Sequence, residues 1–505
     1  MSRHLDHLVE GSPEQRRSAV EALVADRAER DANLRGLEQI IAQQSEIVHG
    51  PTPDGLKAGE PEKYAAINAA AVVQQAAIQA LLGILGPDGL LDNGDLVGLI
   101  DKTGMLDRLG RWPQHVACMS QEGAKAAGEF RSRHRAAAIG KVKLYGLGGS
   151  GAPHDIAAEI LSNSRRTATE IEVVHADAPN PDHVDEHTLA ILSSFSGNTE
   201  ETINCYETIR HKTALLAALA KGGRLREIAR SAEIPFMQIP EDEGHPAYVM
   251  QPRESVCLQM TAALAFLAGV GLNPGSQGGF TAADLEFDEA SALLPRWRER
   301  LGPDVPFREN RAKQLAFFLL YGIDSRGTGP IDFDLWDKKV PFLLADRNNR
   351  ALGHEARTQM HERSKLNVAF YDAPEFLHNL VESIRAGTES SGAGLDPDRW
   401  VYYFIRSADE EPRIRLRLDK TIDLVLKGKA RYAVLEAEGE TPYRRALFAT
   451  YFNAHVTTYL AILNGFDPLP VPTMSWIKNV MGEFPRGGEE ETNAGVCERG
   501  QLEMC

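Results

Sequence analysis

The sequence predicts an α/β protein in which two doubly wound parallel sheets follow a helical extension. Three observations support this fold class. Short apolar runs alternate with helical segments over residues 141–240, and the same alternation returns over residues 340–465. The first 95 residues contain only helical patterns. Strands that form unbroken apolar runs are typical of parallel sheets buried on both faces.

Length, charge and cysteine usage narrow the class of protein. A chain of 505 residues is too long for one ordinary core, so two or three domains are expected. The formal net charge of -16 argues against a nucleic-acid or acidic-membrane partner, because phosphates would be repelled. Five scattered cysteines without a CxxC pair fit reduced thiols rather than disulfides or a zinc site. With no apolar signal segment and no uninterrupted apolar stretch of about 18 residues, we expect neither secretion nor a membrane span, and therefore a cytoplasmic protein.

The first 95 residues are expected to form a helical extension. Ser12, Pro13 and Glu14 have the N-cap, N1 and first-turn chemistry of a helix that runs to about Val48. Residues 60–85 form a second, more apolar helix, closed by "GPDG". The segment is acidic and Ala-rich, which favours packing or assembly over DNA binding.

Residues 96–275 are expected to form the first α/β domain, including a lead-in helix. The apolar runs within it predict strands, and the segments between them predict helices. The predicted strands are 141–148, 170–176, 189–195, 213–219 and 234–240, and the predicted helices are 150–164, 198–211 and 222–232.

Residues 276–484 are expected to form a second α/β domain with C-terminal helices, which suggests a pseudo-repeat. A Gly-rich linker, 271–285, precedes it, and a polar, Gly-rich tail, 485–505, is predicted to be disordered. The predicted strands are 340–346, 366–371, 400–407 and 431–439, and the last predicted helix is 444–465.

Two strand exits of the first domain carry glycines and hydroxyls. "GLGGSG" follows the first strand, with Gly148 and Gly149 able to let backbone N–H groups approach an anion and Ser150 opening a helix. "SSFSGNTEET" follows the third strand. Neither loop holds a lysine, so neutral donors and helix dipoles would bind a phosphate monoester. The predicted phosphate-binding residues are Gly148, Gly149, Ser150, Ser194, Ser196 and Thr199.

These motifs resemble a known family. "LYGLGGSG" and "SSFSGNTEET" resemble the phosphate-binding signatures of the sugar isomerase (SIS) domain, and "PRES" at 252–255 is similar to its Pro-Arg pair. The chain resembles the bifunctional phosphoglucose/phosphomannose isomerase family, which has two SIS domains, from about Gly104 to Met481. The resemblance implies interconversion of glucose 6-phosphate, and of mannose 6-phosphate where both epimers are accepted, with fructose 6-phosphate. It also implies that the reaction uses no metal ion and no other cofactor. The family resemblance further implies a homodimer with an active site shared between subunits.

The same resemblance assigns catalytic roles. An aldose–ketose isomerisation needs a carboxylate for the carbon-bound proton, an acid/base for ring opening and a cation near the enediolate. Glu362 and His378 stand sixteen residues apart, which is the family's own spacing. By resemblance, Glu362 moves the C1/C2 proton, and His378, supplied by the partner subunit, opens the ring. Arg253 then faces the enediolate, and Lys478 in "WIKNVM" matches the family's active-site lysine.

Some residues depart from the family and keep alternatives open. His361 and Arg363 flank the glutamate where the family usually has Asn, and Leu380 replaces an acidic residue two places after the histidine. The alternative function is a phosphosugar-binding SIS protein with altered substrate or degenerate catalysis. A glucosamine-phosphate synthase would need an N-terminal cysteine nucleophile, and position 2 is Ser2. Without the resemblance, other proton-transfer candidates in the same segment stay open: Glu355, Glu375, His354 and His361.

Overall fold

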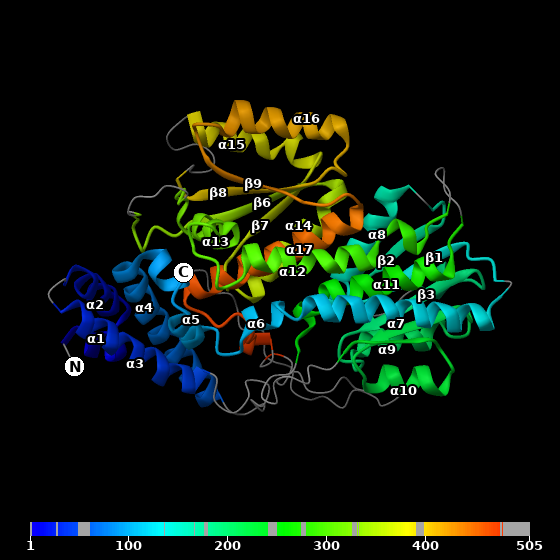
Figure 1. Cartoon of the computed structure of the whole chain (residues 1–505), viewed down its shortest axis with the longest axis horizontal. Coiled ribbons are helices and arrows are strands. Elements are labelled where there is room, and N and C mark those ends of the chain that lie inside the picture. Colours follow the sequence, from blue (N-terminus) through cyan, green and yellow to red (C-terminus); the bar gives the residue numbers. More distant parts are fainter. Residues whose placement is uncertain are drawn as a thin grey trace, which may run out of the picture.

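The chain folds into two parallel sheets and a body of N-terminal helices, with the long helix α17 (Pro442–Asn464) running between them (Figure 1). A computed structural model describes residues 3–26, 29–48, 61–135, 137–165, 167–175, 180–240, 250–273, 279–325, 331, 333–389, 398–474 and 477. All strand pairings within both sheets are parallel. The predicted fold class is confirmed.

The first sheet has strand order β2-β1-β3-β4-β5. All seven residues of β3 are buried, because helices cover both faces of the sheet. Alternate side chains of β3 enter separate cores: Leu189 and Ile191 pack with α7, α8 and α11, whereas Ala190 and Leu192 pack with α9 and α10. The elements are α6 (Met105–Leu109), α7 (Trp112–Arg133), β1 (Lys141–Tyr145), α8 (Ala152–Ser164), β2 (Glu170–Val174), β3 (Thr188–Ser194), α9 (Glu200–Ile209), β4 (Leu216–Ala220), α10 (Gly223–Ser231), β5 (Phe236–Gln238) and α11 (Val256–Val270).

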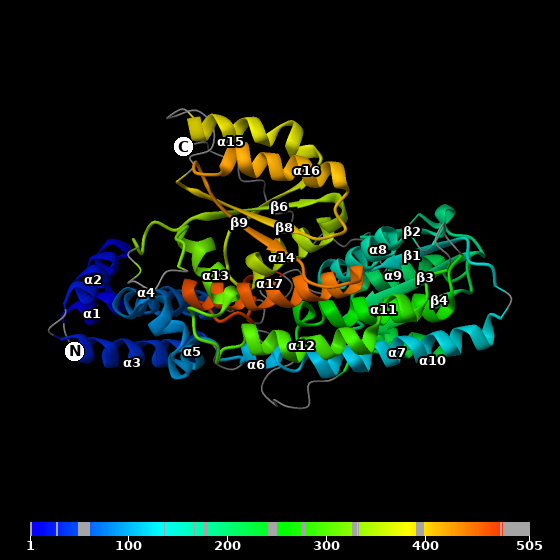
Figure 2. The same ribbon diagram turned by 45° about the horizontal axis from the view of Figure 1, so that its top comes forward.

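The second sheet has strand order β7-β6-β8-β9, the same order as the first four strands of the first sheet, so the two halves repeat one topology. Helices α15 and α16 cover one face, and α14 and α17 cover the other (Figure 2). The elements are α12 (Phe287–Leu301), α13 (Arg311–Tyr321), β6 (Val340–Asp346), α14 (Arg350–Glu362), β7 (Ala369–Ala373), α15 (Leu380–Glu389), β8 (Trp400–Arg406), α16 (Pro412–Thr421), a π-helical turn (Ile422–Leu426) and β9 (Arg431–Glu436).

The N-terminal extension is helical, as predicted, but its first helix is interrupted. Ser12 caps α2 through the Gln15 amide, and the helix ends at Ala25 before α3 begins at Arg30. Gly86 has φ +75 inside α4, so the "GPDG" segment breaks the helix and a short second piece runs to Leu91. The helices are α1 (Arg3–Glu10), α2 (Pro13–Ala25), α3 (Arg30–Val48), α4 (Pro61–Leu91) and α5 (Gly94–Ile100).

The extension packs directly on the second half of the chain. Gln75 and Gln79 of α4 donate hydrogen bonds to the carbonyls of Asn464 and Leu463 at the end of α17, both at 3.1 Å. These carbonyls belong to the last turn of a helix, which has no intrahelical donor for them. The bounds of the four predicted segments, 1–95, 96–275, 276–484 and 485–505, stay predictions, and the predicted disordered tail lies outside the described residues.

The sequence predicts no membrane span, but one helix of the structure has the length and apolar composition of a span. Residues 65–91 of α4 are long and apolar enough to cross one by length and composition. Half of the most apolar window of this helix is buried inside the structure. Because α4 packs against α2, α3 and α17, it has the surroundings of a core helix, and core helices pass the same test.

Candidate active site

The two predicted phosphate-binding loops lie side by side. β1 and β3 pair in register from Lys141–Thr188 to Tyr145–Leu192, so the loops that follow them leave the same edge of the sheet. The amide of Phe195 donates to Ser150 Oγ at 2.9 Å and joins the two loops. Because that oxygen accepts this bond, the Ser150 hydroxyl keeps its own proton available for a ligand.

The second loop is folded around the Ser194 hydroxyl. Ser194 Oγ accepts from the amides of Gly197 at 3.0 Å and Thr199 at 3.3 Å, and lies 2.7 Å from Thr199 Oγ1. Thr199 is the N-cap of α9, so the first amides of that helix open onto the loop. Gly197 has φ +75, and a Cβ there would collide with the Gly222 carbonyl, so only glycine fits. Ser196 is exposed, and its Oγ accepts from the Asn198 amide at 3.1 Å.

The first loop packs against the segment that carries Arg253. A Cβ on Gly149 would lie 2.7 Å from Pro252 Cβ, so the loop and the 3-10 helix Pro252–Glu254 are in close contact. Gln259 of α11 ties them together, because its Nε2 donates to the Gly149 carbonyl at 3.4 Å and to Ser255 Oγ at 2.8 Å. The predicted phosphate loops and Arg253 therefore belong to one site.

Arg253 meets Glu362 across the junction of the two sheets. Arg253 Nη1 donates to Glu362 Oε2 at 3.3 Å. The arginine side chain is 4 % exposed and the glutamate side chain 25 % exposed. Burial lowers the pKa of Arg253, and the neighbouring Glu362 carboxylate opposes that shift. Arg253 Nε and Nη2 are buried without a hydrogen-bond partner among the described residues, so the site has donors free for a ligand oxygen.

Sequence reasoning missed a set of buried charges behind this pair. Arg108 Nη1 donates to Glu254 Oε1 at 3.1 Å, with both side chains almost fully buried. Arg108 belongs to the segment beginning at Gly104, where the resemblance to the family begins. That resemblance could have identified Arg108 as a site residue. Lys365 donates from Nζ to the Glu362 carbonyl and, at 2.7 Å, to the Pro470 carbonyl. Burial, and then the Arg253 cation, lowers the pKa of Lys365 to about 7. No sequence pattern marked Lys365.

The two residues that flank Glu362 point away from its carboxylate. His361 is exposed, and its Nε2 lies 3.2 Å from the Val368 carbonyl. Arg363 is fully buried and donates to two backbone carbonyls. Successive helix residues project about 100° apart, which separates these side chains from Glu362. Replacement of the usual Asn residues therefore leaves the carboxylate facing Arg253.

His378 is not brought to Glu362 within one chain. It ends the 3-10 helix Glu375–His378, is exposed, and lies 3.4 Å from Arg417 Nη1 of α16. That 3-10 helix packs through Phe376 in the core under α15 and α16, on the opposite face of the second sheet from α14. Lys478 lies outside the described residues.

The competing carboxylates occupy different surroundings. Glu355 is 3 % exposed, and burial raises its pKa to about 7. Glu375 is exposed and accepts from Asn379 Nδ2 at 2.9 Å. Of the three glutamates, only Glu362 combines partial exposure with a buried guanidinium beside its carboxylate, which favours it as the proton-transfer group. Among the described residues, no group of three His, Cys, Asp or Glu side chains could hold a metal ion.

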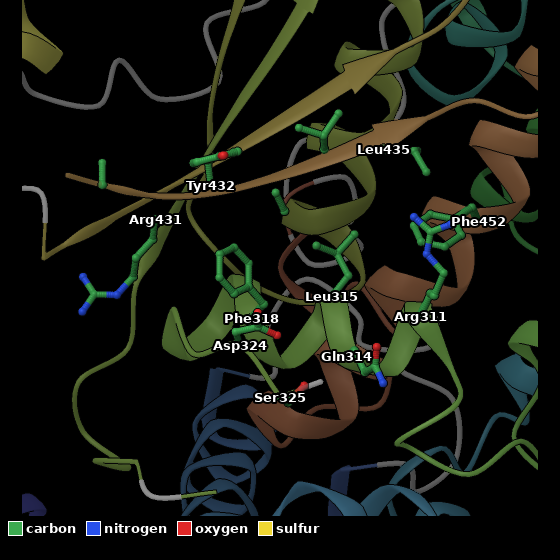
Figure 3. A pocket seen from close by; sticks show the side chains of 13 residues that line it. Arg311, Gln314, Leu315, Phe318, Asp324, Ser325, Arg431, Tyr432, Leu435 and Phe452 are labelled. Carbon is green, nitrogen blue, oxygen red and sulfur yellow. The ribbon is translucent and has the colours of Figure 1, made fainter. Parts of the chain in front are cut away.

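A separate pocket of about 690 Å³ lies between α13 and β9 (Figure 3). Leu315, Phe318 and Phe452 give it an apolar wall, and Arg311 and Arg431 stand at its sides. None of the predicted site residues lines it. Ligands of doubly wound sheets bind at the carboxyl ends of the strands, where the two hydroxyl loops lie, so we place the candidate active site there and not in this pocket.

Two doubly wound domains, one with paired hydroxyl loops, have the architecture expected for a pair of SIS domains. Residues 334–481 match the model of the bacterial phospho-glucose isomerase C-terminal SIS domain. The chain is 27 % identical over 346 residues to the bifunctional phosphoglucose/phosphomannose isomerase of Caldicellulosiruptor bescii, covering 68 % of this chain and 91 % of that protein. It is 24 % identical over 337 residues to the protein of the same name from Aquifex aeolicus, covering 67 % and 89 %.

Solved structures share the fold. The tagatose-6-phosphate ketose/aldose isomerase of Escherichia coli aligns with a TM-score of 0.50 at 16 % identity, covering 73 % of this chain and 95 % of that one. A hypothetical protein from Thermus thermophilus aligns with a TM-score of 0.51 at 14 % identity, covering 82 % and 94 %. The predicted resemblance is confirmed: the chain is a relative of the bifunctional phosphoglucose/phosphomannose isomerases.

Proposed function

We propose that the protein is an aldose–ketose isomerase that interconverts glucose 6-phosphate and mannose 6-phosphate with fructose 6-phosphate through an enediol. The observation that carries the proposal is the contact between Arg253 Nη1 and Glu362 Oε2 at 3.3 Å, beside two loops suited to a phosphate. The named relatives and the matched domain support the same reaction.

The residues suggest a division of labour. The phosphate is held by the loop hydroxyls and by the first amides of α9, which supply donors without adding charge. Glu362 removes the proton from one of C1 and C2 and returns it to the other, a task for which a partly exposed carboxylate is suited. Arg253 stabilises the enediolate oxygen through its free Nε and Nη2 donors. The proton transfer is acid–base chemistry at Glu362, and the contribution of Arg253 is electrostatic.

We propose a homodimer with an active site shared between subunits. The geometry that supports this is the separation of His378 and Glu362 onto opposite faces of the second sheet, because a second copy is then needed to bring an imidazole to the ring oxygen. Lys478 is proposed to join the same site on the basis of the sequence resemblance alone.

We propose a cytoplasmic location, since the substrate class is that of central sugar metabolism and Cys118 and Cys257 form no disulfide within the described part of the chain. Cell fractionation with an antibody against the chain tests this. Recovery in the extracellular fraction would contradict it.

The test of the reaction is conversion of fructose 6-phosphate, followed by a coupled assay of glucose 6-phosphate with and without a chelator. Turnover that the chelator leaves unchanged supports the isomerase. The alternative is a phosphosugar-binding protein with degenerate catalysis, motivated by Arg363 and His361 in place of the family's usual residues. Calorimetric binding of fructose 6-phosphate without turnover would favour that alternative.

A further inference from the structure

Arg363 lies where the two sheets meet, immediately after the last residue of α14. Its side chain is 0 % exposed. Its Nη1 donates to the Ala454 carbonyl of α17 at 3.1 Å, and its Nη2 donates to the Arg253 carbonyl at 3.1 Å. A buried guanidinium is costly unless its donors are paired, so these two bonds fix where the side chain can stand.

The Arg253 carbonyl has a second donor, which comes from α14 itself. Gln359, one turn before Arg363, donates from Nε2 to that carbonyl at 3.4 Å. The C-terminal end of α14 and the residue that follows it therefore hold the Arg253 backbone with two side chains. The carboxylate that Arg253 faces, Glu362, belongs to the same helical turn, so one short piece of α14 contacts both ends of Arg253.

The Arg253 guanidinium itself has few other hydrogen bonds. Two of its three nitrogens have no partner among the described residues. A single 3.3 Å bond to Glu362 does not fix the orientation of a guanidinium plane. The hydrogen bonds from Gln359 and Arg363 to the Arg253 carbonyl hold the backbone of Arg253 as well, and two held positions are needed to fix the orientation of its side chain.

We infer that Arg363 is a positioning residue, which holds the Arg253 carbonyl so that the Arg253 guanidinium stays aligned with Glu362 and with the developing enediolate. The inference rests on the proposed isomerase function. It also gives a role to one departure from the related family, because an Asn side chain is too short to carry donors from α14 to both Arg253 and α17.

The experiment compares purified full-length variants on fructose 6-phosphate. Arg363→Met removes both bonds, Arg363→Lys keeps a cation with fewer fixed donors, and Gln359→Met removes only the longer bond. Arg445→Met is the matched control, because Arg445 is also a buried arginine of this domain but pairs with Asp409 at 2.5 Å. We expect Arg363→Met to lower kcat by about 10²-fold, the order expected for a misplaced catalytic group, with KM changed only a few-fold. The control should lower Tm comparably and keep kcat within a few-fold.

A double-mutant cycle separates positioning from general destabilisation. In an Arg253→Lys background the misplaced guanidinium is already absent, so Arg363→Met should cost much less kcat than it does in the parent. Equal losses in both backgrounds would overturn the inference. If Arg363→Met does not fold, the loss of kcat caused by Gln359→Met and by Arg363→Lys is compared in the same two backgrounds. A parent protein without any turnover rejects the proposed function and this inference together, whereas normal turnover in Arg363→Met rejects this inference alone.

Discussion

Arg253 and Glu362, 109 residues apart in the chain, meet at 3.3 Å between the two α/β halves. Each half contributes one partner. Arg253 lies in the 3-10 helix that follows the last strand of the first sheet, and Glu362 is the last residue of α14, which packs on the second sheet. A proton-transfer carboxylate is thereby placed beside a buried cation and next to the phosphate loops. The following expectations depend on this arrangement.

Replacing Glu362 with Gln should abolish most turnover. The amide keeps the shape and hydrogen-bonding reach but cannot accept a proton from carbon, so kcat should fall at or beyond the upper end of the usual range of about 10²–10⁴-fold. KM should change little, because the phosphate contacts are unaltered. The measurements are kcat on fructose 6-phosphate and deuterium exchange at C2 of the aldose. Glu375→Gln, on the exposed surface, is the control. Near-normal exchange in Glu362→Gln would move the role to Glu355.

Replacing Ser196 and Thr199 together with Ala should weaken phosphosugar binding far more than folding. The Ser196 hydroxyl is exposed at the loop, and Thr199 opens α9, so both can reach an anion at that helix end. Thr208→Ala, near the other end of the same helix, controls for loss of a hydroxyl. Titration calorimetry with fructose 6-phosphate measures the affinity. Equal affinity in the double variant and the control would place the phosphate elsewhere.

Much of the fold could be predicted, because the strands of parallel sheets are continuous apolar runs. β3 and β6 were found from "LAILSSF" and "VPFLLAD", whose residues are almost all buried. The break between α2 and α3 was missed, because no glycine or proline marks it. The two hydroxyl loops could be predicted from local sequence, and they lie together because β1 and β3 are neighbours in the parallel sheet.

The rest of the site depends on contacts between distant segments. The position of His378 relative to Glu362 follows from which face of the sheet each neighbouring helix covers, and a strand pattern buried on both faces does not specify this. The roles of Arg363 and Lys365 arise from backbone carbonyls of Arg253, Glu362 and Pro470. Backbone acceptors are present at every position, so they give no sequence signal.

The N-terminal extension should support stability rather than chemistry. Lys313 of α13 is fully buried and donates to Asp92 at 2.8 Å, to the Leu91 carbonyl at 2.9 Å and to the Pro303 carbonyl at 2.8 Å. Asp92→Ala should lower the free energy of unfolding by roughly 1–3 kcal/mol, the cost of leaving the buried Lys313 amine short of a partner. Turnover per folded site should stay within a few-fold.

The contact between Lys313 and Asp92 also predicts how a truncated chain behaves. Deleting residues 1–92 removes two of the three partners of the Lys313 amine, so the truncated chain should need Lys313→Met to recover stability. Thermal unfolding and kcat of both truncated forms are the measurements. A truncated protein that folds with normal Tm and no activity would place the extension in the chemistry.

Glu159 should make stability depend on pH. It lies on α8, and its Oε1 accepts from the Ala351 amide of α14 at 2.8 Å. Burial raises the pKa of Glu159 from 4.5 to about 8, although the Ala351 bond opposes the shift. The folded state then binds the proton more tightly than the unfolded state, so this group's contribution to stability falls as pH rises from about 4.5 to 8.

Glu159→Gln keeps the accepted bond and removes the titration. The gain in Tm from this substitution should therefore be larger at pH 8 than at pH 5. Glu129→Gln, an exposed carboxylate on α7, is the control. An equal change in Tm at both pH values would show that Glu159 titrates normally.

The shared active site can be tested with two inactive variants in one dimer. Glu362 and His378 lie on opposite faces of one sheet, so in a shared site each catalytic pair combines Glu362 of one subunit with His378 of the other. A heterodimer of a Glu362→Gln chain and a His378→Ala chain then has one site with both defects and one with neither. Such a heterodimer, co-expressed with two tags and purified through both, should recover about half the turnover of the parent dimer, because a two-fold dimer has two equivalent sites.

Sites built within single subunits would instead each carry one defect, and the heterodimer would show only the mean of the two low activities. Comparing kcat of the heterodimer with both variant homodimers on fructose 6-phosphate decides between these arrangements, and a value at that mean would reject the shared site.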